Sequence, residues 1–143
     1  MRAALGDVGL IADDTRQTIV FSGEGKRYEG RNTNRKRILQ YQIDGGMLTS
    51  GMRCDYALGV VVERKFVLVE LKGKHLRHAA MQILATIGQL GGRLNNLAIH
   101  ARIVLSRTPR PDIRSSELIS LEREIIGRGG SVLRQNVAME ENL

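Results

Sequence analysis

The chain has few of the residues on which several classes of protein depend. Among its 143 residues there are one cysteine, no tryptophan and only 3% aromatic side chains. A single cysteine points to a reducing interior compartment, and we expect a cytoplasmic protein. Scarce aromatic residues argue against stacking platforms for single-stranded nucleic acid. Contact with the backbone of a duplex or a junction fits this composition better.

Several motifs are also missing. No apolar stretch is long enough to span a bilayer, and the residues after Met1 lack the charged-then-apolar pattern of a leader, so we expect no membrane partner. No glycine-rich phosphate loop precedes a helix, and no Ser/His/Asp arrangement stands out. The three histidines and one cysteine lack the spacing of zinc ligands. These absences exclude the commonest sequence signatures of nucleotide, acyl-transfer and zinc chemistry.

Positive charge is plentiful. The net charge of +7 favours a polyanionic partner, because neutralised phosphates release counterions. Solvated faces are the alternative explanation for each basic cluster, but taken together they predict contact with nucleic acid, and DNA is the expected partner. The residues expected to make this contact are Arg31, Arg35, Lys36, Arg37, Lys74 and Arg77.

Hydrophobic patterning predicts one α/β domain over residues 1–143, with a mixed sheet flanked by helices. Its core covers about residues 35–137, and residues 1–30 contain no firmly predicted element. Glycine pairs, prolines and a serine N-cap at Ser115 or Ser116 mark the ends of elements. The predicted order is a three-stranded antiparallel meander (35–44, 53–62 and 66–73), a helix (76–95), a strand (98–106), a helix with apolar positions Leu118, Leu121, Ile125 and Ile126, and a last strand (131–137).

The third predicted strand ends with the most informative feature, Glu70-Leu71-Lys72. Residues 66–69 are apolar on both faces, which is typical of a central strand covered on both sides. With a period of two, Glu70 and Lys72 point to one face, about 7 Å apart along the strand. A salt bridge at a fraying strand end is the simple alternative.

Asp55 supplies a second acid on the preceding strand. A short hairpin turn at residues 63–65 allows pairings whose residue numbers sum to 125 or 127, which set Asp55 opposite Glu70 or Lys72. Two close carboxylates repel each other unless a cation lies between them. Oxygen ligands suit Mg²⁺ or Mn²⁺. Lys72 would then be placed to orient or deprotonate a water and to stabilise charge on a phosphate.

Asp55, a gap of fourteen residues and Glu70-Leu71-Lys72 resemble the signature of the PD-(D/E)XK nuclease superfamily. The resemblance covers roughly residues 35–107 and implies a restriction-endonuclease-like core. It also implies that Asp55 and Glu70 bind Mg²⁺, that the backbone carbonyl of Leu71 adds a ligand, and that Lys72 serves the attacking water. Cys54 stands where the signature has proline, at a position that varies widely in the superfamily.

Four further residues are candidates for an auxiliary role. The resemblance implies an acid on a leading helix, where Glu24 or Glu29 would serve, although nearby glycines disfavour a helix and exposed acids are usually solvated. Asp44 reaches the same edge as Asp55 by topology, or it is an ordinary turn residue before Gly-Gly. Gln82 matches a helix glutamine of some exonuclease-like branches, but Thr86 replaces their tyrosine, and Gln82 facing solvent is the alternative.

The sequence thus predicts a magnesium-dependent (or manganese-dependent) nuclease that hydrolyses DNA, with Asp55, Glu70 and Lys72 as its catalytic residues. One alternative is a non-catalytic nucleic-acid-binding protein on the same fold, in which these residues form a structural ion network. Another is a ribonuclease, which only substrate tests separate from a deoxyribonuclease. A homodimer that places two sites on two strands is a further expectation for so small a chain.

Overall fold

The computed structural model describes residues 1–73, 75–106 and 115–143, with only the backbone at residues 72 and 73. A six-stranded mixed sheet in the order β1-β4-β5-β6-β7-β8 forms the centre, and a three-stranded sheet in the order β2-β3-β9 packs beside it. In chain order the elements are α1 (Arg2–Leu5), β1 (Leu10–Asp14), β2 (Thr18–Gly23), β3 (Lys26–Arg31), β4 (Ile38–Gln42), β5 (Tyr56–Val60), β6 (Lys65–Gly73), α2 (Leu76–Leu90), the 3₁₀ turn η1 (Gly91–Leu94), β7 (Ala98–Leu105), α3 (Ser116–Gly127), β8 (Val132–Asn136) and β9 (Ala138–Asn142).

The predicted meander is confirmed. Strands β4, β5 and β6 pair antiparallel in sequence order, whereas β7 pairs parallel with β6 and β8 pairs parallel with β7. The two parallel connections run through α2 and α3, as a parallel crossover requires. The sheet is therefore mixed, with the antiparallel part bringing the end of β4, the start of β5 and the end of β6 to one edge.

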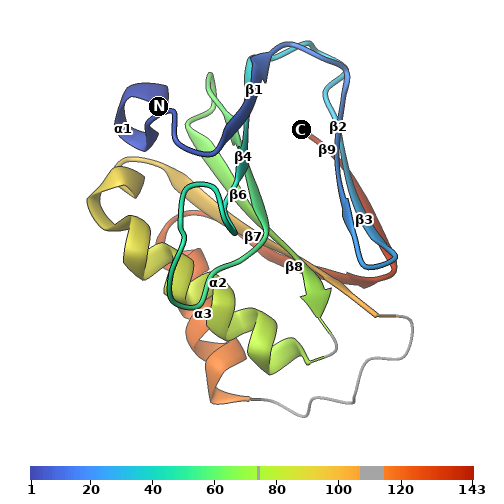
Figure 1. The fold of residues 1–143 in the computed structure, drawn as a ribbon, viewed down its shortest axis with the longest axis vertical. Coiled ribbons are helices and arrows are strands. Elements are labelled where there is room, and N and C mark those ends of the chain that lie inside the picture. The colour runs from blue at the N-terminus through green and yellow to red at the C-terminus, as the bar shows by residue number, and fades with distance from the viewer. Residues whose placement is uncertain (74, 107–114) are drawn as a thin grey trace.

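The central strand β6 is covered on both faces, as its apolar run predicts. Phe66 and Leu68 belong to a core cluster shared with α2 and α3, while Val67, Val69 and Leu71 belong to a second cluster shared with β2, β3 and β9. Figure 1 shows these layers, with the two longer helices on one side of the central sheet and the smaller sheet on the other. The helices thus cover one face, and the other face packs against strands.

The smaller sheet lies largely in the segment for which the sequence predicted no firm element. Strands β2 and β3 form a hairpin that buries Ile19, Phe21 and Tyr28. β3 also pairs in parallel with β9, more than a hundred residues later in the chain. A leading helix is reduced to the four residues of α1. Local patterns miss this sheet because its completing strand is so distant in sequence.

Helix α3 begins at its predicted cap, but its buried face is narrower than predicted. The Ser115 side chain accepts a hydrogen bond from the Leu118 backbone N–H at 3.1 Å. Leu121 and Ile125 are fully buried, but Ile126 is 70% exposed and does not belong to the predicted apolar stripe. Successive helix residues are rotated by about 100°, so a narrow contact face includes residue 125 and leaves residue 126 in solvent. None of the described helices is long and apolar enough to cross a membrane.

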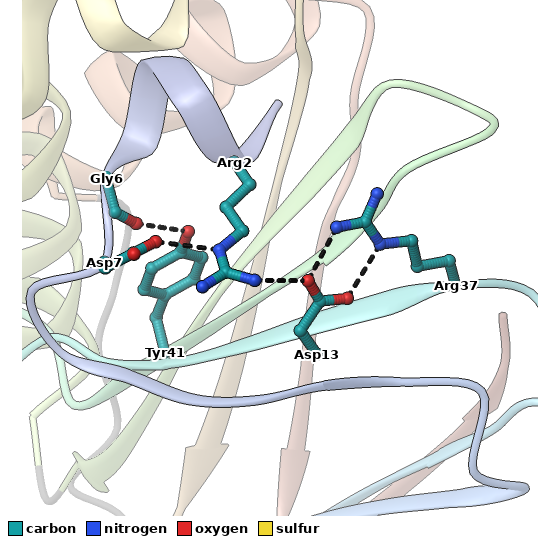
Figure 2. Close-up of polar contacts among 6 residues, drawn as sticks. All are labelled: Arg2, Gly6, Asp7, Asp13, Arg37 and Tyr41. Atoms are coloured by element: carbon teal, nitrogen blue, oxygen red, sulfur yellow. Dashed lines mark hydrogen bonds and ion pairs between the residues drawn. The ribbon is translucent and has the colours of Figure 1, made fainter.

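Polar contacts fix α1 and the edge strand β1 to the sheet (Figure 2). The Asp13 carboxylate accepts hydrogen bonds from Arg2 Nη1 at 2.9 Å and from Arg37 Nε at 2.7 Å, and the Tyr41 hydroxyl donates to the Gly6 carbonyl at 2.8 Å. The hydrogen bond from Arg37 outweighs partial burial and, with Arg2, lowers the pKa of Asp13 to about 2. Arg37 is thus already engaged with an acid of its own chain.

Candidate functional site

Asp55 and Glu70 meet at the edge where β5 begins and β6 ends. Tyr56 pairs with Val69 in the β5–β6 ladder, so residue numbers sum to 125 and Asp55 falls opposite Glu70. The first of the two predicted registers is therefore confirmed. Asp55 is 5% exposed and Glu70 is fully buried. Acids are rarely this buried without a specific role, which makes the pair the leading candidate site.

The Asp55 carboxylate extends the β-ladder beyond Tyr56, the first residue of β5. Its Oδ2 accepts a hydrogen bond from the Leu71 backbone N–H at 2.7 Å. The Asp55 backbone carbonyl accepts from the N–H groups of Ile43 and Asp44, at 2.9 and 3.2 Å. Asp55 is thus held by the chain on both sides, and its carboxylate takes the position of a strand carbonyl.

Asp44 lies beside Asp55, as the meander topology predicts. Its carboxylate Oδ1 accepts a hydrogen bond from Arg53 Nε at 2.8 Å. It is also the second residue of a tight turn in which the Gly46 N–H donates to the Ile43 carbonyl at 3.2 Å. Asp44 is therefore a turn residue that lies at the carboxylate edge, and its auxiliary role stays a prediction.

Helix α2 holds the segment that leads into Asp55. Thr86 Oγ1 accepts from the Cys54 backbone N–H and donates to the Gln82 carbonyl, both at 2.8 Å. Gln82 Nε2 donates to the Arg53 carbonyl at 3.3 Å, and Gln89 Nε2 donates to the Met52 carbonyl at 2.9 Å. Three polar side chains at helical spacing thus bind three successive backbone units. Gln82 faces this segment rather than open solvent, and Thr86 is a positioning residue that the sequence did not single out.

Cys54 is fully buried next to the carboxylate pair. Burial raises the pKa of its thiol, and the negative charges of Glu70 and Asp55 raise the pKa further. The thiol is therefore protonated at physiological pH, and a thiolate nucleophile is disfavoured here. The neighbourhood is suited to carboxylate chemistry.

A pocket of about 140 Å³ opens beside Asp55 on the face of the smaller sheet, and Asp44, Leu71 and Glu24 line it as well. Glu24 occupies the β2–β3 hairpin turn with a left-handed backbone, at φ 51°. The hairpin is held against β5 by Phe21, whose ring stacks on Tyr56 with centroids 4.7 Å apart. The structure therefore brings Glu24 to the pocket on a hairpin, without the helix that the resemblance implies.

Glu29 lies elsewhere. On β3 it accepts a hydrogen bond from Arg27 at 2.8 Å and forms an ion pair with Arg31 at 3.4 Å. The hydrogen bond from Arg27 outweighs partial desolvation and lowers the pKa of Glu29. Glu29 is absent from the lining of the pocket beside Asp55, and its neighbours are surface arginines. Of the two glutamates considered, only Glu24 lines the pocket beside Asp55.

The residues expected to bind nucleic acid are divided between different parts of the molecule. Arg31 lies on β3 and pairs with Glu140, and residues 35–37 precede β4 at the end of the sheet opposite Asp55. Arg77, in the first turn of α2, is near the carboxylate edge and pairs with Glu117 at 3.0 Å. Lys74 and the side chain of Lys72 lie outside the described residues. The described members of this set therefore do not form a single basic face around the site.

Oxygen atoms dominate the ligands that this edge offers to a cation. Within residues 1–73, 75–106 and 115–143, no group of three His, Cys, Asp or Glu side chains converges on one point that could hold a metal ion. The register brings two carboxylates to this edge, those of Asp55 and Glu70. Such a set fits Mg²⁺, which binds one or two carboxylates and keeps several waters.

The fold and the site define an α/β protein with a buried carboxylate pair at the edge of its central sheet. No protein-family model, curated protein or solved structure matches this chain.

Replacing Thr86 with valine is expected to destabilise the protein by about 1–3 kcal/mol, because the buried Cys54 N–H loses its acceptor while the side-chain shape is kept. Thr86→Ser retains the hydroxyl and is the matched control, with most of the stability preserved. Urea unfolding of both variants measures the difference. Equal stability of Thr86→Val and the parent protein would show that the hydroxyl does not hold this segment.

Proposed function

We propose that the chain is a magnesium-dependent nuclease of the PD-(D/E)XK type, on a restriction-endonuclease-like fold, that hydrolyses DNA phosphodiester bonds with metal-activated water. The observation that carries this proposal is the pairing of Asp55 with Glu70 at the ends of adjacent central strands, where both are almost completely buried. Placing two acids together away from water is costly unless a cation offsets their repulsion.

Asp55, Glu70 and the Leu71 carbonyl would hold the metal. The Leu71 N–H points towards the Asp55 carboxylate. In the proposal the carbonyl of the same residue supplies a further oxygen ligand. When bound, Mg²⁺ supplies a Lewis acid for the phosphate and lowers the pKa of a coordinated water. The ladder and the backbone bonds to Ile43 and Asp44 keep Asp55 in a fixed orientation.

Lys72 follows Glu70 by two residues on β6. In the proposal its ammonium orients the attacking water and stabilises the charge that develops on the phosphate. A single such electrostatic contact typically contributes a factor of about 10²–10³ to a rate. Glu24, on the β2–β3 hairpin, lines the pocket beside Asp55 on the face of the smaller sheet.

Cleavage of DNA is the direct test. Purified protein with Mg²⁺ or Mn²⁺ is expected to cut at least one of linear, circular, branched and single-stranded DNA, and EDTA should stop the reaction. Glu70→Gln and Lys72→Met are each expected to lower the rate by about 100-fold or more. Glu122→Gln, at an exposed position on α3, is the matched control and should cut normally.

Two outcomes would contradict the proposal: no cleavage of any of these substrates, or undiminished cleavage by Glu70→Gln. A parallel measurement follows the metal alone. The melting temperature should rise with Mg²⁺ in the parent protein and not in Asp55→Asn, since a ligand that binds only the folded state stabilises it. RNA substrates, tested alongside, separate a ribonuclease from a deoxyribonuclease.

A non-catalytic nucleic-acid-binding protein is the second candidate. It is favoured by the structural use of the same acids, because Asp55 caps the Leu71 N–H and Asp44 pairs with Arg53. In that case no form of DNA would be cleaved and Mg²⁺ would leave the melting temperature unchanged, while Asp55→Asn would lower stability without changing affinity for DNA.

A further inference from the structure

A basic surface lies at the end of the central sheet opposite the carboxylate pair. There the segment before β4 lies against the β5–β6 turn, with the Val61 N–H donating to the Arg37 carbonyl at 3.1 Å. The β5–β6 turn also contacts the start of β7, where the Ala98 N–H donates to the Arg64 carbonyl at 2.9 Å. We call this surface the basic end, and its cationic residues are Arg35, Lys36, Arg37, Arg64 and Lys65.

Acids of the same chain neutralise only part of the basic end. Lys36 pairs with Glu63, and Arg37 pairs with Asp13. Arg35 and Arg64 are exposed, and among the described residues neither forms an ion pair. The surface therefore keeps a positive potential that attracts a polyanion.

The backbone of these two arginines is a second, independent observation. Arg35 and Arg64 both have φ 52°, in the left-handed region that side chains other than glycine rarely adopt. Asparagine or glycine is the usual solution at such a turn position. Arg64 Nε does donate to the Asn96 carbonyl at 3.1 Å, but this contact is exposed and cannot explain Arg35. Two turn positions thus carry arginine although their backbone favours glycine or asparagine. This indicates that the two side chains have a functional role.

The basic end is separate from the carboxylate pair. Lys65 begins β6 and Glu70 follows five residues later, which corresponds to roughly 17 Å at 3.3 Å per residue. One phosphate cannot contact both. The whole chain has few aromatic side chains, so this surface is not suited to single-stranded nucleic acid, which binds by stacking of its bases on aromatic rings.

We propose that the basic end is a metal-independent contact surface for the phosphate backbone of duplex DNA, with Arg35 and Arg64 as its principal contacts. Guanidinium groups are suited to this role because they donate to phosphate oxygens in a bidentate fashion. The proposal stands independently of nuclease activity, since the carboxylate pair occupies the other end of the sheet.

The test is fluorescence anisotropy of a labelled short duplex in EDTA, with the Arg35→Gly/Arg64→Gly double variant. Affinity is expected to fall by about 10-fold or more at low salt, and the slope of log K against log salt should decrease by about two. The melting temperature should stay the same or rise, because glycine relieves the left-handed backbone. A purely structural role for these arginines predicts the reverse, a lower melting temperature with unchanged binding.

Arg123→Gln/Arg134→Gln is the matched control, because it removes the same charge from exposed positions on α3 and β8. It is expected to change affinity by less than about 2-fold, since no phosphate contact is lost. The proposal is overturned if the parent protein does not bind the duplex, if the glycine variant binds as tightly as the parent, or if the control weakens binding equally. Binding to phosphatidylserine vesicles that is lost in the glycine variant, with DNA binding unchanged, would also overturn it. Glu70→Gln should bind the duplex normally. The loss of cleavage in that variant can therefore be distinguished from the loss of duplex binding in the glycine variant.

Discussion

Gly130→Ala is expected to destabilise the protein by about 3 kcal/mol or more and to lower its melting temperature by roughly 10 °C. Gly130 crosses the start of β7, where a Cβ atom would overlap the carbonyl oxygen of Ile99 and lie 2.5 Å from its carbonyl carbon. The Gly130 N–H also donates to the Ile125 carbonyl at 3.0 Å, so the segment cannot simply move away. Urea unfolding measures the loss of free energy.

Gly88→Ala is the matched control for this substitution. Gly88 lies within α2, and a Cβ atom there would meet nothing within 4 Å. Alanine is favoured over glycine in a helix interior, so the variant should be more stable by about 0.5–1 kcal/mol. Alanine is thus expected to lower the stability at position 130 and to raise it at position 88. A Gly130→Ala variant as stable as the parent would mean that residues 128–131 do not lie against β7 as described.

Glu141→Gln is expected to cost about 3 kcal/mol, because it leaves a buried guanidinium without its counter-charge. Glu141 Oε2 accepts from Arg102 Nε at 2.8 Å and from the Tyr28 hydroxyl at 2.6 Å. The Arg102 side chain is only 4% exposed. These contacts join β7 of the central sheet to β3 and β9 of the smaller one. The variant should therefore loosen the packing of the two sheets.

The loss of stability on acidification should also depend on Glu141. Burial alone would raise the pKa of this carboxyl, but the hydrogen bonds from Arg102 and Tyr28 and the charge of Arg102 hold it below its ordinary value of 4.5. A carboxyl whose pKa is lowered by folding stabilises the protein above its ordinary pKa, and this stabilisation is lost as the pH falls below about 4.5. Stability of Glu141→Gln should decline less steeply in this range.

The neighbouring residue provides the control. Glu140 pairs with Arg31, but both side chains are about half exposed, so Glu140→Gln should cost less than about 1 kcal/mol. In a double-mutant cycle, Arg102→Met combined with Glu141→Gln should cost clearly less than the sum of the two single changes. Additive costs would show that Arg102 and Glu141 are not coupled.

The central part of the fold was predictable because local rules determine it. A short turn and a period of two fix the β5–β6 register, and the sum of 125 that places Asp55 opposite Glu70 was one of only two options. Asp44 followed from the same meander. The helix predicted over residues 76–95 ends as an α-helix at Leu90, and the glycine pair that follows begins the 3₁₀ turn η1. Elements whose partners are adjacent in sequence can be derived from pattern alone.

What could not be predicted depends on distant pairing. Strand β3 is completed by β9, and Tyr28 and Glu141 are 113 residues apart in the chain. The sequence therefore gave no reason to expect Glu24 on a hairpin beside Asp55. It also grouped Arg35 and Arg77 as one basic set, whereas they lie at opposite ends of the sheet. The resemblance places a tyrosine at the position of Thr86, and the role of this threonine depends on a backbone N–H, that of Cys54, which a local pattern does not reveal.

The Asp55 carboxylate that caps Leu71 makes one backbone amide a reporter of the site. While the carboxylate accepts this hydrogen bond at 2.7 Å, the amide hydrogen is protected from exchange with solvent deuterium. Any ligand that recruits this carboxylate oxygen competes with the amide, and the exchange rate of that single hydrogen then increases. Occupancy of the carboxylate edge can thus be followed at one position of the chain, without observing any reaction.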